Sequence, residues 1–265
     1  MIASHLLLLF GVGSLAGLLA GFFGVGGGVI LGPFLLFFLQ AQGLEVNLAA
    51  RLAFGTSLFC AFFNSVFSVY RHNRQRNVEW RVVPYLAVSA IVGAYLGSSV
   101  ASQLPGEILK KILALVLVVL AVQVFFGVGE KAGKAFRLDW RQTVPIGFLA
   151  GFFAAMAGIG GGVFFVPALI LFVHLPVKKT AGTSSAIIIF TTFAAAVGYF
   201  IHGLGTPNLP PGCLGYVYAL AAAPILLGSL FFSQLGAYLN SVLPPKWLRA
   251  FFGVFLFGIF LKLVF

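Results

Sequence analysis

One glycine-rich stretch occurs twice in this chain, and it limits the possible folds more than any other feature. Residues 17–33 read GLLAGFFGVGGGVILGP, and residues 151–167, 134 positions later, read GFFAAMAGIGGGVFFVP. Three adjacent glycines interrupt a helix, because each costs about 1 kcal/mol relative to alanine in a helix interior. Helices interrupted at matching places in two apolar halves are typical of membrane transporters built from repeats, whose substrate site lies at the interruptions.

The composition requires a lipid bilayer around the chain. Of 265 residues, 61% are hydrophobic and 8% are charged, whereas about a quarter of the residues of a soluble domain are charged. The apolar segments are continuous and do not alternate with polar residues, so we expect spanning helices and not barrel strands. The net charge is +11, but the basic residues lie in short loops where they fix topology, and we predict no nucleic-acid partner.

Hydropathy predicts an all-α polytopic membrane protein with two inverted repeats of five helical segments. The first repeat covers residues 1–128, a charged linker covers 129–141, and the second repeat covers 142–265. A short helix follows each glycine triplet, and it either spans the membrane or forms a re-entrant hairpin with the helix before it. The ten segments lie at about 2–23, 29–39, 48–70, 82–102, 108–126, 143–157, 163–174, 180–202, 215–239 and 247–265.

The repeat extends beyond the glycines. The sequence Gly-Thr-Ser at 55–57 in the third segment matches 182–184 in the eighth, at an offset of 127, and residues 97–105 match 236–244. Because five is odd, the second repeat enters the membrane upside down relative to the first. Lys and Arg concentrate on one side of this topology, so we expect a multi-pass protein of the plasma (inner) membrane with a cytoplasmic linker and both termini outside.

The polar residues exclude several classes of function. All five acidic residues lie in loops or at segment ends, so nothing resembles a carboxylate proton relay. No Ser/His/Asp set, HExxH motif or phosphate-binding loop is present, and the two cysteines have no metal-type spacing. We therefore predict that the protein is not an enzyme and holds no metal or cofactor. Without a buried carboxylate to attract a cation, a neutral or anionic substrate is favoured.

Each glycine triplet is a candidate anion site, because the helix after it begins with free N–H groups and the positive end of the macrodipole. Close helix packing is the alternative role for these glycines. Ser57, Asn64 and Ser68 recur on one helical face and offer further donors, unless such hydroxyls only bond to their own helices. The predicted substrate-binding residues are Gly26, Gly27, Gly28, Thr56, Ser57, Asn64, Gly160, Gly161, Gly162, Thr183, Ser184 and Thr191.

Four more residues are candidates for attracting the substrate or for coupling. Arg51 and Lys178 are equivalent under the offset of 127, and they either draw anions to the two mouths of the pathway or anchor helix ends at the interface. His174 and His202 lie near predicted membrane boundaries, where they could titrate in a proton-coupled cycle. A sodium site could use unwound carbonyls and hydroxyls. The possible coupling ion is therefore a proton or sodium.

The paired glycine stretches, the two Gly-Thr-Ser motifs and the two Leu-Pro ends together resemble the sulfite exporter TauE/SafE family of membrane permeases. The matching residues are 24–33 with 158–167, 55–57 with 182–184, and 97–105 with 236–244. The resemblance implies a transporter, usually an exporter, of small sulfur-containing anions such as sulfite or organosulfonates. We expect alternating access around a midplane site; the alternatives are an anion channel with the same donors, or a membrane-embedded enzyme or assembly subunit.

Overall fold

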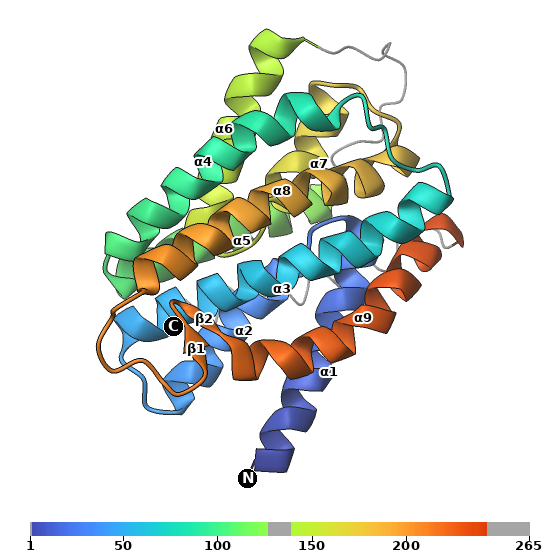
Figure 1. The fold of residues 1–265 in the computed structure, drawn as a ribbon. Helices are drawn as coiled ribbons and strands as arrows, with labels where there is room; N and C mark the ends of the chain where they lie inside the picture. Colours follow the sequence, from blue (N-terminus) through green and yellow to red (C-terminus); the bar gives the residue numbers. More distant parts are fainter. Residues whose placement is uncertain (1, 127–138, 243–265) are drawn as a thin grey trace.

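The computed structural model of the chain describes residues 2–126 and 139–242, and it confirms an all-α polytopic membrane fold (Figure 1). Of the described helices, α1, α3, α4, α8 and α9 are long and apolar enough to cross a membrane. The tenth predicted segment and most of the predicted linker lie outside the described residues. The helices are α1 (Ile2–Phe23), α2 (Gly28–Ala41), α3 (Val46–Arg74), α4 (Val83–Gln103), α5 (Gly106–Phe126), α6 (Trp140–Met156), α7 (Gly162–Leu171), α8 (Val177–Gly203) and α9 (Ala219–Val242).

Small residues bring helices together in two matching pairs. Helix α1 packs along α9, and α6 packs along α4. A Cβ atom on Gly17 of α1 would lie 2.7 Å from Ser229 Cα of α9, and a Cβ atom on Gly151 of α6 would lie 2.9 Å from Ala90 Cα of α4. Gly17 and Gly151 are equivalent residues of the two stretches. Each glycine is therefore needed for a close helix contact of the kind that drives association in membranes.

Helices α3 and α8 lie side by side and run antiparallel (Figure 1). The loop after α3 contacts the start of α8, because the N–H group of Glu79 donates to Thr183 Oγ1. The segment after α8 contacts the first half of α3, because the N–H group of Tyr218 donates to Thr56 Oγ1. The polar faces of both helices are thereby turned inward, and most of their hydroxyl side chains are buried.

The helices that follow the glycines are too short to cross a bilayer upright. Helix α2 has 14 residues and α7 has 10. At 1.5 Å per residue these are about 21 Å and 15 Å long, against a hydrocarbon core of about 30 Å. Most residues of α2 and half of those of α7 are buried against the rest of the protein.

Several predicted boundaries are wrong by three or four residues: α7 ends at Leu171 and not at residue 174, α8 begins at Val177 and not at residue 180, and α9 ends at Val242 and not at residue 239. Helix α6 begins at Trp140 and not at Thr143, because Asp139 caps it: Asp139 Oδ1 accepts a hydrogen bond of 3.0 Å from the N–H group of Arg141. Helix α3 continues past Tyr70 to Arg74. Hydropathy ends with the apolar residues, whereas the basic last turn of α3 is favoured by the helix dipole.

The predicted start of the ninth segment is also wrong. A short antiparallel hairpin of β1 (Cys213–Leu214) and β2 (Val217–Tyr218) precedes α9. Gly215 lies in its turn with a φ of 56°, a conformation that glycine adopts readily. The hairpin is held by a tertiary contact with Thr56 of α3, and no local sequence pattern predicted it.

Candidate functional site

The two glycine breaks lie against the same pair of side chains. Gly26 and Gly160 are equivalent and have φ angles of 77° and 86°. A Cβ atom on Gly26 would lie 3.1 Å from Ile188 Cγ2 and 3.7 Å from Ala61 Cβ. A Cβ atom on Gly160 would lie 3.6 Å and 3.5 Å from the same two atoms. The structure therefore brings the two predicted breaks together, beside Ala61 of α3 and Ile188 of α8.

A glycine with a left-handed backbone stands at the start of each short helix. Gly27 precedes α2 with a φ of 78°, Gly161 precedes α7 with a φ of 101°, and neither helix receives a side-chain cap at this residue. The first N–H groups of a helix have no partner within the helix, and the positive end of its dipole lies there. Each break therefore presents backbone donors that no capping side chain occupies.

The third glycine of each triplet serves close packing. A Cβ atom on Gly28 would lie 2.7 Å from the carbonyl carbon of Ile159, and one on Gly162 would lie 2.7 Å from the carbonyl oxygen of Gly24. In both cases the neighbouring backbone belongs to the other repeat. Close packing, the alternative role expected for the glycines, is therefore present at Gly28 and Gly162.

Equivalent serines of α3 and α8 bind the break of the opposite repeat. Ser57 Oγ donates to the carbonyl oxygen of Gly158, and Ser184 Oγ donates to the carbonyl oxygen of Gly24, both at 2.8 Å. All four residues are buried. A hydroxyl group has one proton to donate, so the protons of both serines are engaged in holding the breaks.

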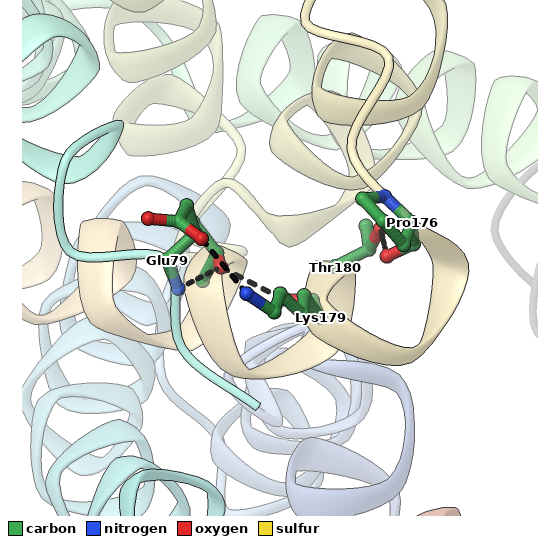
Figure 2. Close-up of polar contacts among 5 residues, drawn as sticks. Glu79, Pro176, Lys179 and Thr180 are labelled. Carbon is green, nitrogen blue, oxygen red and sulfur yellow. Dashed lines mark hydrogen bonds and ion pairs between the residues drawn. The ribbon is translucent and has the colours of Figure 1, made fainter. Parts of the chain in front are cut away.

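The predicted threonines Thr56 and Thr183 bind backbone at the two ends of the bundle. Thr183 Oγ1 accepts from the N–H group of Glu79 at 2.9 Å and donates to the carbonyl oxygen of Lys179 at 2.7 Å. Figure 2 shows this end, where Lys179 Nζ also lies 2.9 Å from Glu79 Oε2 and Thr180 donates to Pro176. Thr56 accepts from Tyr218 at the other end. Both threonines thus fix the segment that follows the neighbouring long helix.

Asn64 differs from its equivalent, Thr191, in its hydrogen bonds. Thr191 Oγ1 donates to the carbonyl oxygen of Ile187, one turn earlier in α8, at 3.1 Å. Asn64 is fully buried, and within the described residues neither its Nδ2 nor its Oδ1 has a hydrogen-bond partner. Asn64 Nδ2 lies 2.8 Å from the position that a Cβ atom on Gly27 would take. The side chain therefore points at the first break.

Ser65 is a residue that the sequence-based site omitted. It is fully buried, and its Oγ likewise has no partner among the described residues. It lies 3.4 Å from the position of a Cβ atom on Gly26. Its equivalent, Thr192, donates to the carbonyl oxygen of Ile188 at 2.6 Å. The match of Ser65 with Thr192 at the offset of 127 was the available signal.

The predicted substrate-attracting residues lie at the helix ends, away from the breaks. Arg51 is 13 residues before Asn64 on α3, or about 20 Å along the helix axis. Its guanidinium group lies 3.4 Å from Tyr216 Oη and 3.4 Å from the carbonyl oxygen of Leu104. Lys178 is exposed in the first turn of α8. A position at a helix end fits both predicted roles, attraction of anions and anchoring at the interface.

Of the histidines, one that the sequence analysis passed over is the most buried. His72 in the last turn of α3 is fully buried; its Nε2 lies 3.0 Å from the carbonyl oxygen of Gly21, and its Nδ1 has no partner among the described residues. It lies beyond the predicted end of its segment, and this explains the omission. His174 lies in the irregular segment between α7 and α8, and His202 Nδ1 donates to the carbonyl oxygen of Gly198 at 2.7 Å.

Comparison with known proteins identifies the family of the chain. The sequence profile described as Sulfite exporter TauE/SafE matches residues 9–263. The chain belongs to the TauE/SafE family. A probable membrane transporter protein of Haemophilus influenzae is 32% identical to it over 96% of each chain. A probable membrane transporter protein of Methanocaldococcus jannaschii is 28% identical over 91% of this chain and 89% of that relative. No solved structure matches the chain.

Membership of the TauE/SafE family confirms the resemblance noted in the motifs. It makes this chain a multi-pass protein of a family of membrane transporters. The names of the relatives specify neither a substrate nor a mechanism of transport.

Proposed function

We propose that this TauE/SafE protein is a secondary-type permease that exports small sulfur-containing anions, such as sulfite or organosulfonates, across the plasma (inner) membrane. The observation that carries the proposal is the meeting of the two glycine breaks beside Ala61 and Ile188. Two helices begin there with left-handed glycines and no side-chain cap. Backbone N–H groups and helix dipoles bind an anion without a buried cation. The family description supplies the substrate class.

Alternating access is supported by the reciprocal contacts between the repeats. Ser57 of the first repeat bonds to Gly158 of the second, and Ser184 of the second bonds to Gly24 of the first. Equivalent helices α3 and α8 run antiparallel, as inverted repeats require. Rocking of one repeat against the other around the breaks would open the site to each side in turn.

The orientation and the coupling belong to the same proposal. Arg71, Arg74 and Lys179 gather where α3 ends and α8 begins, so the positive-inside rule places this end, with the linker 129–141, in the cytoplasm and both termini outside. Lys178 would then attract anions at the inner mouth and Arg51 at the outer mouth. The coupling ion is a proton or sodium, with His174 and His202 as candidate proton carriers.

Reconstitution in liposomes tests the function. Purified protein should give sulfite flux that saturates and supports counterflow, and sulfate, thiosulfate and a sulfonate should be tested as competitors. Ionic conductance far above carrier rates would indicate an anion channel that uses the same donors. An absence of flux for all of these anions would overturn the proposed substrate class.

A further inference from the structure

Two unpartnered polar side chains stand in the interior of α3. Asn64 Nδ2, Asn64 Oδ1 and Ser65 Oγ are buried without a hydrogen-bond partner among the described residues. Polar groups buried without a partner destabilise a protein, and nearly all such groups in folded proteins are paired. Side by side at one place, they leave hydrogen-bonding capacity that a ligand can satisfy.

Both side chains point at the start of α2. Asn64 Nδ2 lies 2.8 Å from the position of a Cβ atom on Gly27, the residue that precedes this helix, and Ser65 Oγ lies 3.4 Å from that of Gly26. A ligand bound there would contact the backbone N–H groups of Gly28 and Val29 together with the Asn64 amide and the Ser65 hydroxyl. The next two N–H groups of α2 already donate to the carbonyl oxygen of Gly27. Two independent features, an uncapped 14-residue helix and unpartnered side chains, thus coincide.

The second break lacks this arrangement. Thr191 and Thr192 donate their protons to backbone carbonyls of α8. What Thr192 presents to the break is its methyl group, because Cγ2 lies 3.0 Å from the position of a Cβ atom on Gly160. The ring of Phe165 lies 2.6 Å from the corresponding position on Gly161. The side chains at the second break therefore present carbon atoms, whereas the first break also meets two polar side-chain atoms, Asn64 Nδ2 and Ser65 Oγ.

We propose that the substrate binds at the first break alone, against α2, Asn64 and Ser65, and that it is a monoanionic sulfur oxyanion with an O–H or N–H donor of its own. This inference rests on the proposed function. The N–H groups of α2 and Asn64 Nδ2 bind the anionic oxygens, whereas Asn64 Oδ1 only accepts and therefore needs a donor from the ligand. A helix N-terminus contributes about half a positive charge, which suits a monoanion such as hydrogen sulfite better than a dianion.

The test compares Asn64→Leu with Thr191→Val, the matched change at the equivalent position. Asn64→Leu should raise the KM for sulfite by about tenfold or more, the effect of losing hydrogen bonds to a ligand, whereas Thr191→Val should leave it within about twofold because its hydroxyl serves its own helix. Ser65→Ala should lie between the two. The melting temperature of Asn64→Leu without substrate should equal or exceed that of the wild type, because an unpaired buried amide is removed.

Two sulfonates that differ by one hydroxyl test the required donor. The wild type should be inhibited more strongly by 2-hydroxyethanesulfonate than by ethanesulfonate, and Asn64→Leu should abolish the difference. Wild-type liposomes that move no sulfur anion would overturn the proposed function and this inference with it. Saturable wild-type flux with an unchanged KM in Asn64→Leu, or with equal inhibition by the two sulfonates, would overturn this inference alone.

Discussion

The equivalent helices α3 and α8 carry one pair of equivalent residues with the same hydrogen bonds and, two turns further along, a pair whose hydrogen bonds differ. Ser57 and Ser184 each donate to a glycine carbonyl of the opposite repeat at 2.8 Å. Seven residues later, Thr191 bonds to its own helix while Asn64 has no partner among the described residues. Residues that hold the breaks in place are needed in both repeats, because the serine of each repeat binds the break of the other. Under the proposed site, the residues that contact the ligand are free to differ between the two repeats.

The largest effect is expected from a side chain at the glycine breaks. A Cβ atom on Gly27 would lie 2.8 Å from Asn64 Nδ2 and 2.9 Å from the carbonyl oxygen of Ala16, and the left-handed backbone adds strain. Gly27→Leu should reduce sulfite flux by roughly a hundredfold, as misplacement of binding groups by about 1 Å does.

Two further variants sharpen this result. Gly161→Leu should be equally inactive, because the ring of Phe165 occupies the space. Gly11→Leu is the control, since nothing lies within 4 Å of its Cβ position. All three are compared by flux and by the amount of monodisperse protein in the membrane. Wild-type flux in Gly161→Leu would show that transport needs only the first break.

The reciprocal serine bonds should contribute equally to stability. Ser57→Ala and Ser184→Ala each leave a buried carbonyl without its donor, and each should lower the free energy of unfolding by about 1–2 kcal/mol. Thermal unfolding in detergent measures both. Unequal effects would contradict the reciprocity of the two repeats. Weaker sulfite binding at unchanged stability would instead assign the two hydroxyls to the ligand.

A second pair of equivalent residues offers a smaller test. His72 Nε2 lies 3.0 Å from the carbonyl oxygen of Gly21, and Tyr199 Oη donates to the carbonyl oxygen of Ala155 at 3.2 Å. His72→Phe and Tyr199→Phe each remove one donor, so each should lower the free energy of unfolding by about 1 kcal/mol. The pH dependence of sulfite flux separates a stabilising role from a role in proton coupling. A pH profile altered only in His72→Phe would assign proton coupling to this histidine.

The smallest effect is expected at the ends of the bundle. Glu79 pairs with Lys179 at 2.9 Å (Figure 2), whereas at the other end Arg51 meets the neutral Tyr216 hydroxyl at 3.4 Å. Because both partners of the ion pair are partly exposed, Glu79→Gln should lower the free energy of unfolding by about 0.5 kcal/mol or less. The difference in the free energy of unfolding between Glu79→Gln and the wild type should become smaller at high salt. A larger, salt-insensitive loss would mean that this end carries more of the stability than its exposure suggests.

Part of the candidate site followed from local sequence patterns, and the remainder did not. The breaks at Gly27 and Gly161 were predicted because consecutive glycines disfavour helix wherever they occur. Asn64 was predicted as a substrate-binding residue from its helical face. The same prediction included Thr191, whose hydroxyl bonds to its own helix, and it omitted Ser65. The hairpin at 213–218 was missed because it is held by Thr56, more than 150 residues earlier.

The sequence by itself determined the membrane-spanning α-helical class, the duplication and the places where helices break, because apolar length and glycine content act locally. Only the tertiary structure decided which polar side chains are already hydrogen bonded. Asn64 and Thr191 are equivalent in the repeat, yet Thr191 bonds to Ile187 and Asn64 lies against Gly27 without a partner among the described residues. A hydrogen bond needs its acceptor within about 3 Å, and that proximity is set by the packing of helices distant in sequence.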